Sequence, residues 1–189
     1  MHVAGDLCNV SDATAWRAIH SIIEKLVKYR NSIIKFPRPE EFARVAAKFK
    51  EKRGFPSVLG CIDGSHFSIL VPKSDIRETF RNRKGFFSLN AQAICGPDCY
   101  VYDLVCRWPG SAHDSTIWKD SSAYHKISSP VFEGYHILGD AAYPLTTRLI
   151  TPYRNPDDRS KSNLFLSIII MKPHYKEHST SSIPQQEWP

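Results

Sequence analysis

The segment "VLGCIDGSHFSILVP", residues 58–72, decides the fold class of this chain. It opens on an apolar run, and two glycines bracket a Cys-Ile-Asp group that ends on Asp63. Apolar runs with β-branched residues, bounded by glycine and proline, are typical of β-strands. We therefore expect a strand that carries an aspartate followed by a small residue.

A second segment, "GYHILGDAAYP" at residues 134–144, has the same arrangement. Its apolar part ends on Gly139 and Asp140, and small residues follow. Two-metal phosphoryl-transfer sites need hard carboxylate oxygens at strand ends to hold Mg²⁺ or Mn²⁺, and small neighbours let a phosphate backbone approach. The alternative is that each aspartate accepts hydrogen bonds from backbone amides in a turn. The spacing alone leaves both interpretations open.

The order of elements between these two segments predicts a mixed α/β domain. Residues 89–110 are expected to form a β-hairpin across a Gly-Pro-Asp turn. A short helix follows, with Ser111 or Asp114 near its cap. The sequence thus predicts three antiparallel strands, a helical crossover and a returning strand, which together make a mixed sheet with helices packed on it.

The first 56 residues predict a small helical region. Residues 10–34 have an apolar stripe after a polar cap at Ser11 or Asp12, and a second helix is expected over 40–52. The start, "AGDLCNVSDATAWRAI", is similar to the second half of a helix-turn-helix, although an ordinary helical hairpin fits the same pattern. We expect three parts, namely a helical region over 1–56, a core over 57–156 and a disordered tail over 157–189.

The composition points to a polyanionic partner and a reducing compartment. The 189 residues carry a formal net charge of +6, which favours an acidic partner such as nucleic acid. No apolar run approaches the roughly 20 residues that cross a bilayer, and the amino end lacks the basic and apolar regions of a secretory signal. The odd count of five cysteines argues against a disulfide framework, so we expect the cytosol or the nucleus.

A basic insert lies between the first strand and the hairpin, in "SDIRETFRNRKGFFS" at residues 74–88. Placed near the acids, its cations would neutralise phosphates and its aromatic residues would let a base stack, although a solvated loop is the alternative. Downstream, His113 and Asp114 stand at the start of the expected short helix, where Asp114 either caps that helix or reaches the acids. The candidate nucleic-acid contacts are Arg77, Arg81, Arg83 and Lys84.

Three segments in order carry a family resemblance. They are "GFPSVLGCIDGSHF", "RWPGSAHDSTIW" and "ILGDAAYPLTTRLITPYRNP", and together they resemble the Harbinger (PIF/Harbinger) transposase-derived nucleases over roughly residues 1–156. The resemblance implies an RNase H-like catalytic core with a DDE acid triad and a divalent metal, Mg²⁺ or Mn²⁺. The family's first acid matches Asp63 and its second matches Asp140. Asp114 and His113 belong to a family motif at the edge of that site, for which we expect a supporting role.

The chain departs from the family pattern near Asp157. The family's third acid is a glutamate in a helix, and here Glu177 lies at a similar distance in the sequence without that helical context. The Lys172-Pro173-His174 segment would break a helix at this place. We therefore expect that Glu177 is not the third acid, that the catalytic core is truncated at its C-terminal end, and that activity is lost or impaired.

The resemblance implies a divalent-metal-dependent nuclease that hydrolyses phosphodiester bonds in DNA. It also implies a nuclear location, with the cytoplasm as a second compartment, and a Myb-like partner protein that supplies DNA binding or nuclear entry. We expect no membrane association and no small-molecule cofactor. The alternative function is a non-catalytic module that binds DNA or protein and retains the acids from a transposase ancestor.

Overall fold

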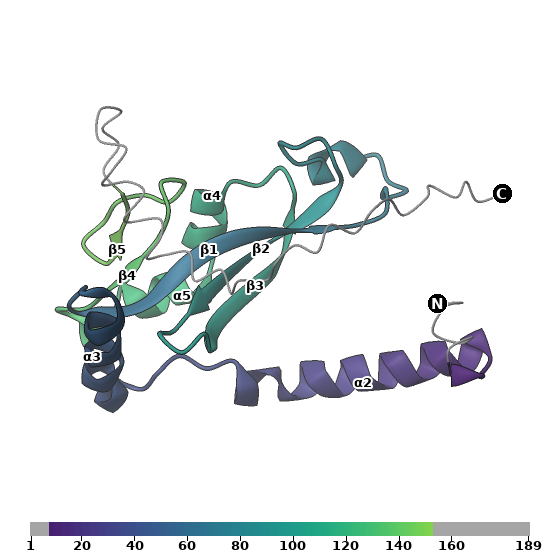
Figure 1. Ribbon diagram of the computed structural model, residues 1–189. Coiled ribbons are helices and arrows are strands. Elements are labelled where there is room, and N and C mark those ends of the chain that lie inside the picture. The colour runs from purple at the N-terminus through teal and green to yellow at the C-terminus, as the bar shows by residue number, and fades with distance from the viewer. Residues whose placement is uncertain (1–7, 153–189) are drawn as a thin grey trace.

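A computed structural model describes residues 8–152 of the chain (Figure 1). The longest helix, α2 (Asp12–Ile33), begins after Ser11, whose side chain accepts a hydrogen bond from the amide of Thr14. This confirms the predicted first helix and its serine cap. The first helix of the expected helix-turn-helix, the tail over 157–189 and Glu177 lie outside the described residues.

The second predicted helix forms with a later start than expected. A 3-10 turn, η1 (Pro39–Glu41), precedes α3 (Phe42–Arg53), because the backbone amide of Arg38 donates to the Glu41 carboxylate and tightens the first turn. The helix ends at Gly54, whose φ of 76° is the left-handed conformation that glycine adopts at low cost. The apolar face of α3 is buried as predicted, through Phe42, Val45, Ala46 and Phe49.

A five-stranded mixed sheet forms the centre of the molecule, with the strand order β3-β2-β1-β4-β5 (Figure 1). The first three strands are antiparallel neighbours, and β4 and β5 are parallel to β1. The prediction of a hairpin followed by a returning strand is therefore confirmed. The strands are β1 (Val58–Ser68), β2 (Ser88–Cys95), β3 (Val101–Pro109), β4 (His136–Leu138) and β5 (Leu149–Ile150).

The crossover between β3 and β4 contains two short helices, α4 (Asp114–Lys119) and α5 (Ser122–Ile127), and the 3-10 turn η3 (Pro130–Phe132). The first helix starts where expected, but neither Ser111 nor Asp114 is its N-cap residue. Its N-cap residue is His113, no side chain caps it, and Asp114 is its first helical residue. The reason is a competing partner, since the Asp114 carboxylate accepts a hydrogen bond from Asn90 on β2.

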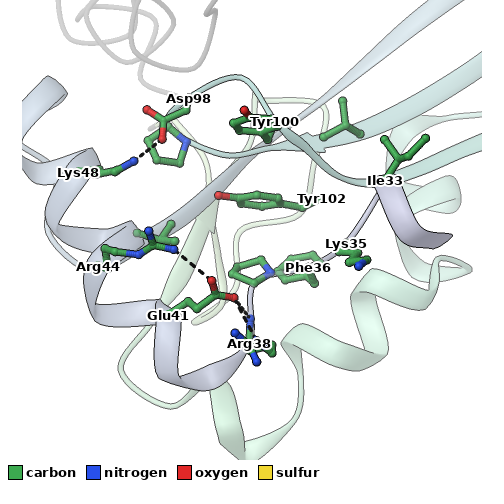
Figure 2. Close-up of a pocket in the computed structure, with 14 residues that line it drawn as sticks. Ile33, Lys35, Phe36, Arg38, Glu41, Arg44, Lys48, Asp98, Tyr100 and Tyr102 are labelled. Atoms are coloured by element: carbon green, nitrogen blue, oxygen red, sulfur yellow. Dashed lines mark hydrogen bonds and ion pairs between the residues drawn. The ribbon is translucent and has the colours of Figure 1, made fainter. Parts of the chain in front are cut away.

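Two lysines on α3 form ion pairs with Asp98 in the turn of the β2–β3 hairpin. Figure 2 shows one of them, Lys48, pointing toward Asp98. The ammonium groups of Lys48 and Lys52 lie 2.5 Å and 2.9 Å from the Asp98 carboxylate. These two hydrogen bonds lower the pKa of Asp98 to about 2. A cavity of about 610 Å³ lies beside this contact, between α3 and the hairpin, and Tyr102 is among its lining residues.

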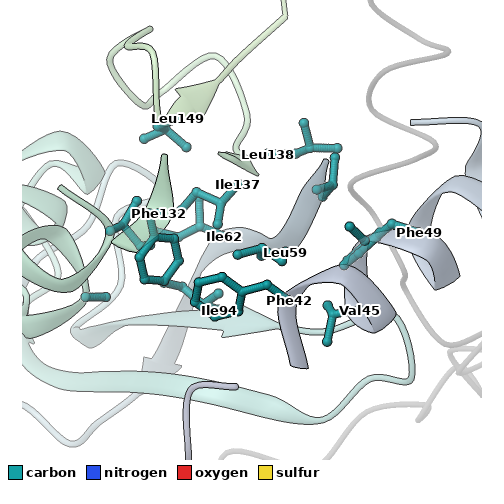
Figure 3. Close-up of a cluster of buried hydrophobic side chains, with 14 of the residues drawn as sticks. Phe42, Val45, Phe49, Leu59, Ile62, Ile94, Phe132, Ile137, Leu138 and Leu149 are labelled. Carbon is teal, nitrogen blue, oxygen red and sulfur yellow. The ribbon is translucent and has the colours of Figure 1, made fainter. Parts of the chain in front are cut away.

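The core joins the sheet to α3 and to the crossover (Figure 3). Ile62, Ile94 and Ile137 come from three adjacent strands and have no exposed surface. Gly60 permits this packing, because a Cβ at that position would lie 2.9 Å from Cγ2 of Ile94. Burial of these side chains fixes β1 against β4, and thereby fixes the strand ends that carry the acids.

No helix among the described residues is long and apolar enough to cross a membrane. The predicted boundaries at residues 56 and 156 stay predictions.

Candidate active site

Asp63 and Asp140 leave two neighbouring parallel strands at matching positions. The last paired residues of β1 and β4 are Cys61 and Leu138. Each aspartate lies two residues further along its strand direction, so the register of the sheet sets both acids at the same edge of the β1–β4 pair. Asp63 is exposed and Asp140 is half-buried. The predicted strand end is wrong for Asp63, because β1 continues to Ser68 and Asp63 still pairs with Ala93 of β2; only its pairing with β4 ends before it.

Asp114 reaches the same region from the start of α4. A Cβ built on Gly64 would lie 2.8 Å from Oδ1 of Asp114, so this carboxylate rests against the backbone of β1 next to Asp63. The side-chain amide of Asn90 donates to Oδ1 of Asp114 and to the carbonyl of Ala112, both at 3.1 Å. Because Asn90 is only 2% exposed, its two hydrogen bonds fix the Asp114 carboxylate in place.

The carboxylates of Asp114 and Asp140 repel each other. Burial raises the pKa of Asp140, the hydrogen bond from the backbone amide of Ala142 opposes this, and the negative charge of Asp114 raises the pKa further. A like charge that shifts a titration in this way is close and poorly screened. A cation bound between these acids would relieve the repulsion.

The negative charges of Asp63, Asp114 and Asp140 all act on the hydroxyl of Tyr143, a residue for which the sequence predicted no role. Its side chain is 2% exposed, and its hydroxyl has no hydrogen-bond partner among the described residues. Burial raises the pKa of the Tyr143 hydroxyl, and the charges of Asp114, Asp63 and Asp140 raise it further. The position of this tyrosine, three residues after Asp140, was the available sequence signal.

Asp63 and Asp140 also accept local backbone hydrogen bonds. Oδ1 of Asp63 accepts from the amide of Gly64 at 2.8 Å, and Oδ1 of Asp140 accepts from the amide of Ala142 at 3.0 Å. The turn interpretation thus holds for Asp140, whereas Asp63 and Gly64 lie within β1 and form no turn. It does not exclude metal ligation, because a carboxylate has two oxygens with about four acceptor sites.

The chemistry of these side chains fits a hard divalent cation. Carboxylate oxygens are the ligands that Mg²⁺ and Mn²⁺ prefer, and the half-buried, like-charged pair at Asp114 and Asp140 favours a positive ion. Within residues 8–152, no three His, Cys, Asp or Glu side chains are close enough together to hold a metal ion as they stand. The acids whose oxygens would hold such an ion are Asp63, Asp114 and Asp140, and their side chains would have to move to bind it together.

The basic insert contacts the loop that precedes α4. The Arg83 guanidinium donates to Nδ1 of His113 at 2.5 Å, and the amide of Ser111 donates to the carbonyl of Thr79 at 3.0 Å. Since His113 is the neighbour of Asp114, the insert lies beside the acids rather than apart from them. The insert is mostly loop, as expected, with one 3-10 turn, η2 (Arg77–Phe80).

The four predicted cations of the insert are not equivalent. Arg77 and Arg81 both pair with Glu78, at 3.5 Å and 2.8 Å. In the described part of the chain, Arg83 and Lys84 form no ion pair with an acid. Two of the four predicted cations thus share the single negative charge of Glu78.

Comparison with known proteins identifies the family. The chain matches the model of the DDE superfamily endonuclease family over residues 62–170. It is 29% identical over 154 residues to the human protein "Putative nuclease HARBI1", a match that covers 81% of this chain and 44% of the human protein. It is 25% identical over 172 residues to "Protein ALP1-like" of Arabidopsis thaliana, covering 82% of this chain and 41% of that protein.

The chain spans less than half the length of these curated relatives. No solved structure matches it with significance. The family match confirms the resemblance to the transposase-derived nucleases and implies the RNase H-like fold, with which the mixed five-stranded sheet agrees. Members of this superfamily generally use divalent metals. The chain belongs to the DDE superfamily endonucleases.

Proposed function

We propose that this chain is a divalent-metal-dependent nuclease that hydrolyses phosphodiester bonds in DNA. The observation that carries the proposal is that Asp63 and Asp140 lie two residues beyond the last paired residues of neighbouring parallel strands, in a chain that matches the DDE superfamily endonucleases. Asp63 comes from β1, Asp114 from the first turn of α4, and Asp140 is the second residue after β4. A rigid sheet and a hydrogen-bonded helix start are the supports that a preorganised site needs.

Asp63, Asp114 and Asp140 are the proposed metal ligands, and the family match supports a divalent ion as their cofactor. When bound, Mg²⁺ or Mn²⁺ supplies Lewis-acid polarisation of the phosphate and activates water as the nucleophile. The protein contributes the orientation of its acids. Asn90 holds one carboxylate oxygen of Asp114, and the amide of Ala142 holds one of Asp140, which leaves each acid a second oxygen for the ion.

Asp114 takes the part of the third acid in this proposal. The expected glutamate context is missing from the sequence around Glu177, whereas Asp114 is close enough to Asp140 to raise its pKa. This goes beyond the supporting role expected from the sequence. It is supported by the contact of the Asp114 carboxylate with the backbone of β1 at Gly64.

DNA is the proposed substrate, and the basic insert is its proposed contact. Arg83 and Lys84 carry the charge that is not shared with Glu78, and Arg83 adjoins the acids through His113. Cations at this place would neutralise the phosphates that flank the scissile bond. His113 orients Arg83 and so supports the site indirectly. A nuclear location and a Myb-like partner complete the proposal, and both rest on the resemblance to the family.

Calorimetric titration of the metal-free chain with Mn²⁺ tests the site. We expect binding to the unmodified chain and at least roughly ten-fold weaker binding to Asp114→Asn and Asp140→Asn, because each removes a charged ligand. The matched control is Asp120→Asn, which removes an exposed acid at the other end of α4 that pairs with Arg107. Equal Mn²⁺ affinity in all four proteins would contradict the proposal.

The second candidate function is a non-catalytic DNA-binding module. It is favoured by the lack of a closed three-ligand group within residues 8–152. In that case Asp140→Asn keeps or strengthens DNA affinity, because it removes a negative charge near the phosphates, and Mn²⁺ changes neither binding nor the DNA. A filter-binding assay with and without Mn²⁺ distinguishes the two functions.

A further inference from the structure

The helix α2 exposes a wide apolar face. Ile22, Leu26 and Ile33 are 57%, 58% and 66% exposed, although isoleucine and leucine are normally buried. The helix runs outside the layers formed by the sheet and the crossover helices (Figure 1). Among residues 8–152 no other element packs extensively against it. A contiguous exposed apolar surface of this kind marks an interaction site.

The apolar residues of α2 follow a heptad repeat. Steps of four and three residues alternate along the helix, which is the spacing of the a and d positions of a coiled coil. This seam consists of Ala15, Ile19, Ile22, Leu26, Tyr29 and Ile33. The opposite face is polar and carries Arg17, Glu24 and Lys28. A globular packing helix needs no such strict repeat, whereas a helix that pairs with another long helix does.

We propose that the seam of α2 pairs with the seam of a second copy of this chain, in antiparallel orientation. Centred between Ile22 and Leu26, the pairing sets Leu26 of each copy against Ile22 of the other. In the same register, Tyr29 of one copy lies against Ile19 of the other. Each large side chain thus meets another apolar one, as knobs-into-holes packing requires.

The residues that flank the seam select the orientation. Antiparallel pairing brings like edges together, so Ile23 meets Ile23 of the second copy and Trp16 meets Arg30, which is a cation–π pair. Parallel pairing instead sets Lys25 beside Arg30 of the second copy, where two positive charges repel. Antiparallel pairing also sets Lys25 against Lys25 of the second copy, which is one repulsion, whereas parallel pairing sets Lys25 beside Arg30 twice, once from each copy.

The surface is large enough for a specific dimer. Six large apolar residues on the seam and its flanking edge are about half exposed, and at roughly 100 Å² each they present about 600 Å² per copy. Specific protein interfaces use about 600 to 1,000 Å² per partner. The residues are Trp16, Ile22, Ile23, Leu26, Tyr29 and Ile33.

Sedimentation equilibrium of the whole chain over a range of micromolar concentrations tests the pairing. We expect a monomer–dimer equilibrium, and we expect Leu26→Glu to weaken dimerisation at least about 100-fold because it buries two unpaired charges. Lys28→Glu, on the polar face, is the matched control and stays dimeric. Since Leu26 is exposed, circular dichroism of the variant should match that of the unmodified chain. A monomer at all concentrations, or a Leu26→Glu dimer of unchanged affinity, would overturn the proposal.

The orientation has its own test. In the antiparallel dimer Lys25 faces Lys25 of the second copy, so Lys25→Glu replaces one repulsion by another and changes the dimer affinity by less than about two-fold. In a parallel dimer the same substitution turns a repulsion with Arg30 into an attraction. A clear tightening of the dimer by Lys25→Glu would therefore overturn the antiparallel arrangement.

Discussion

Oδ1 of Asp114 lies 2.8 Å from the point where a side chain on Gly64 would begin. The glycine that follows Asp63 on the central strand is thus the reason that the first residue of α4 can rest on the sheet. Any larger residue at this position would push the Asp114 carboxylate away from its neighbours. Gly64, the residue after Asp63 on β1, therefore decides where the Asp114 carboxylate of α4 can lie.

Substitution Gly64→Ala should damage the site more than the fold. The added methyl group displaces the Asp114 carboxylate, and a displacement of about 1 Å costs between about 10- and 100-fold in rate. Mn²⁺-dependent DNA cleavage by the variant measures this loss. Ser65→Ala, at the next and exposed position of β1, is the control and should keep its activity. Full activity in Gly64→Ala would show that Asp114 is not needed.

The charge on Asp140 should make the metal-free protein less stable at neutral pH. Its pKa is raised in the folded state, so the folded chain binds more protons than the unfolded chain between the two pKa values. The free energy of unfolding therefore falls as pH rises through the folded pKa. Asp140→Asn removes this penalty, and its Tm at pH 7 should exceed that of the unmodified chain.

Two comparisons accompany this measurement. The difference in Tm should vanish below about pH 3.9, where both states are protonated. Adding Mn²⁺ should raise the Tm of the unmodified chain and not that of Asp140→Asn, because only the former binds the ion. A lower Tm for Asp140→Asn at pH 7 without metal would mean that its hydrogen bond to Ala142 outweighs the electrostatic cost.

The basic insert predicts opposite effects of two substitutions on DNA affinity. Arg83→Ala should weaken DNA binding. It should also reduce the slope of log binding constant against log salt concentration by about 0.9 in magnitude, the value of one phosphate contact. Glu78→Gln should strengthen binding, because it frees Arg77 and Arg81 from their ion pairs. The control is Arg44→Ala, because Arg44 lies on α3 and pairs with Glu41 of η1. Fluorescence anisotropy at several salt concentrations measures the DNA affinity of all three variants. Weaker DNA binding by Glu78→Gln would contradict the proposal that the insert contacts DNA.

The contact of Asp98 with Lys48 and Lys52 should stabilise the hairpin at neutral pH. Because its pKa is lowered to about 2, the carboxylate contributes stability that is present above its unfolded pKa of about 3.9 and is lost as pH falls through about 2. Urea unfolding of Asp98→Asn should show lower stability than the unmodified chain at pH 7 and an equal stability near pH 2. High salt should narrow the gap, since these groups are exposed. A gap that persists at pH 2 would point to another cause.

The longer strands and the strand-end position of Asp140 were predictable from the sequence because their signals are local. The apolar run that ends on Asp63 gave the wrong boundary, since β1 continues to Ser68 through pairing with β2, a contact that the local sequence does not show. The two-residue strand β5 was missed, because Leu149 and Ile150 are too short a stretch to show any periodicity.

The relations around Asp114 were not predictable in the same way. Its partners Gly64 and Asn90 lie far away in the sequence, so local rules for helix caps could not decide between a cap and a contact with the sheet. The ion pairs of Glu78 with its basic neighbours depend on a 3-10 turn that the loop sequence does not reveal. Contacts set by tertiary packing thus decided which charges remain available at the site.

The most direct test of the central claim is nicking of supercoiled plasmid in Mn²⁺ by the chain and by Asp140→Asn, each first shown to be folded. The account predicts that the unmodified chain nicks the plasmid and that the variant does not, with Asp120→Asn retaining activity. No nicking by the folded, unmodified chain, or equal nicking by Asp140→Asn, would contradict the assignment of these acids to a nuclease site.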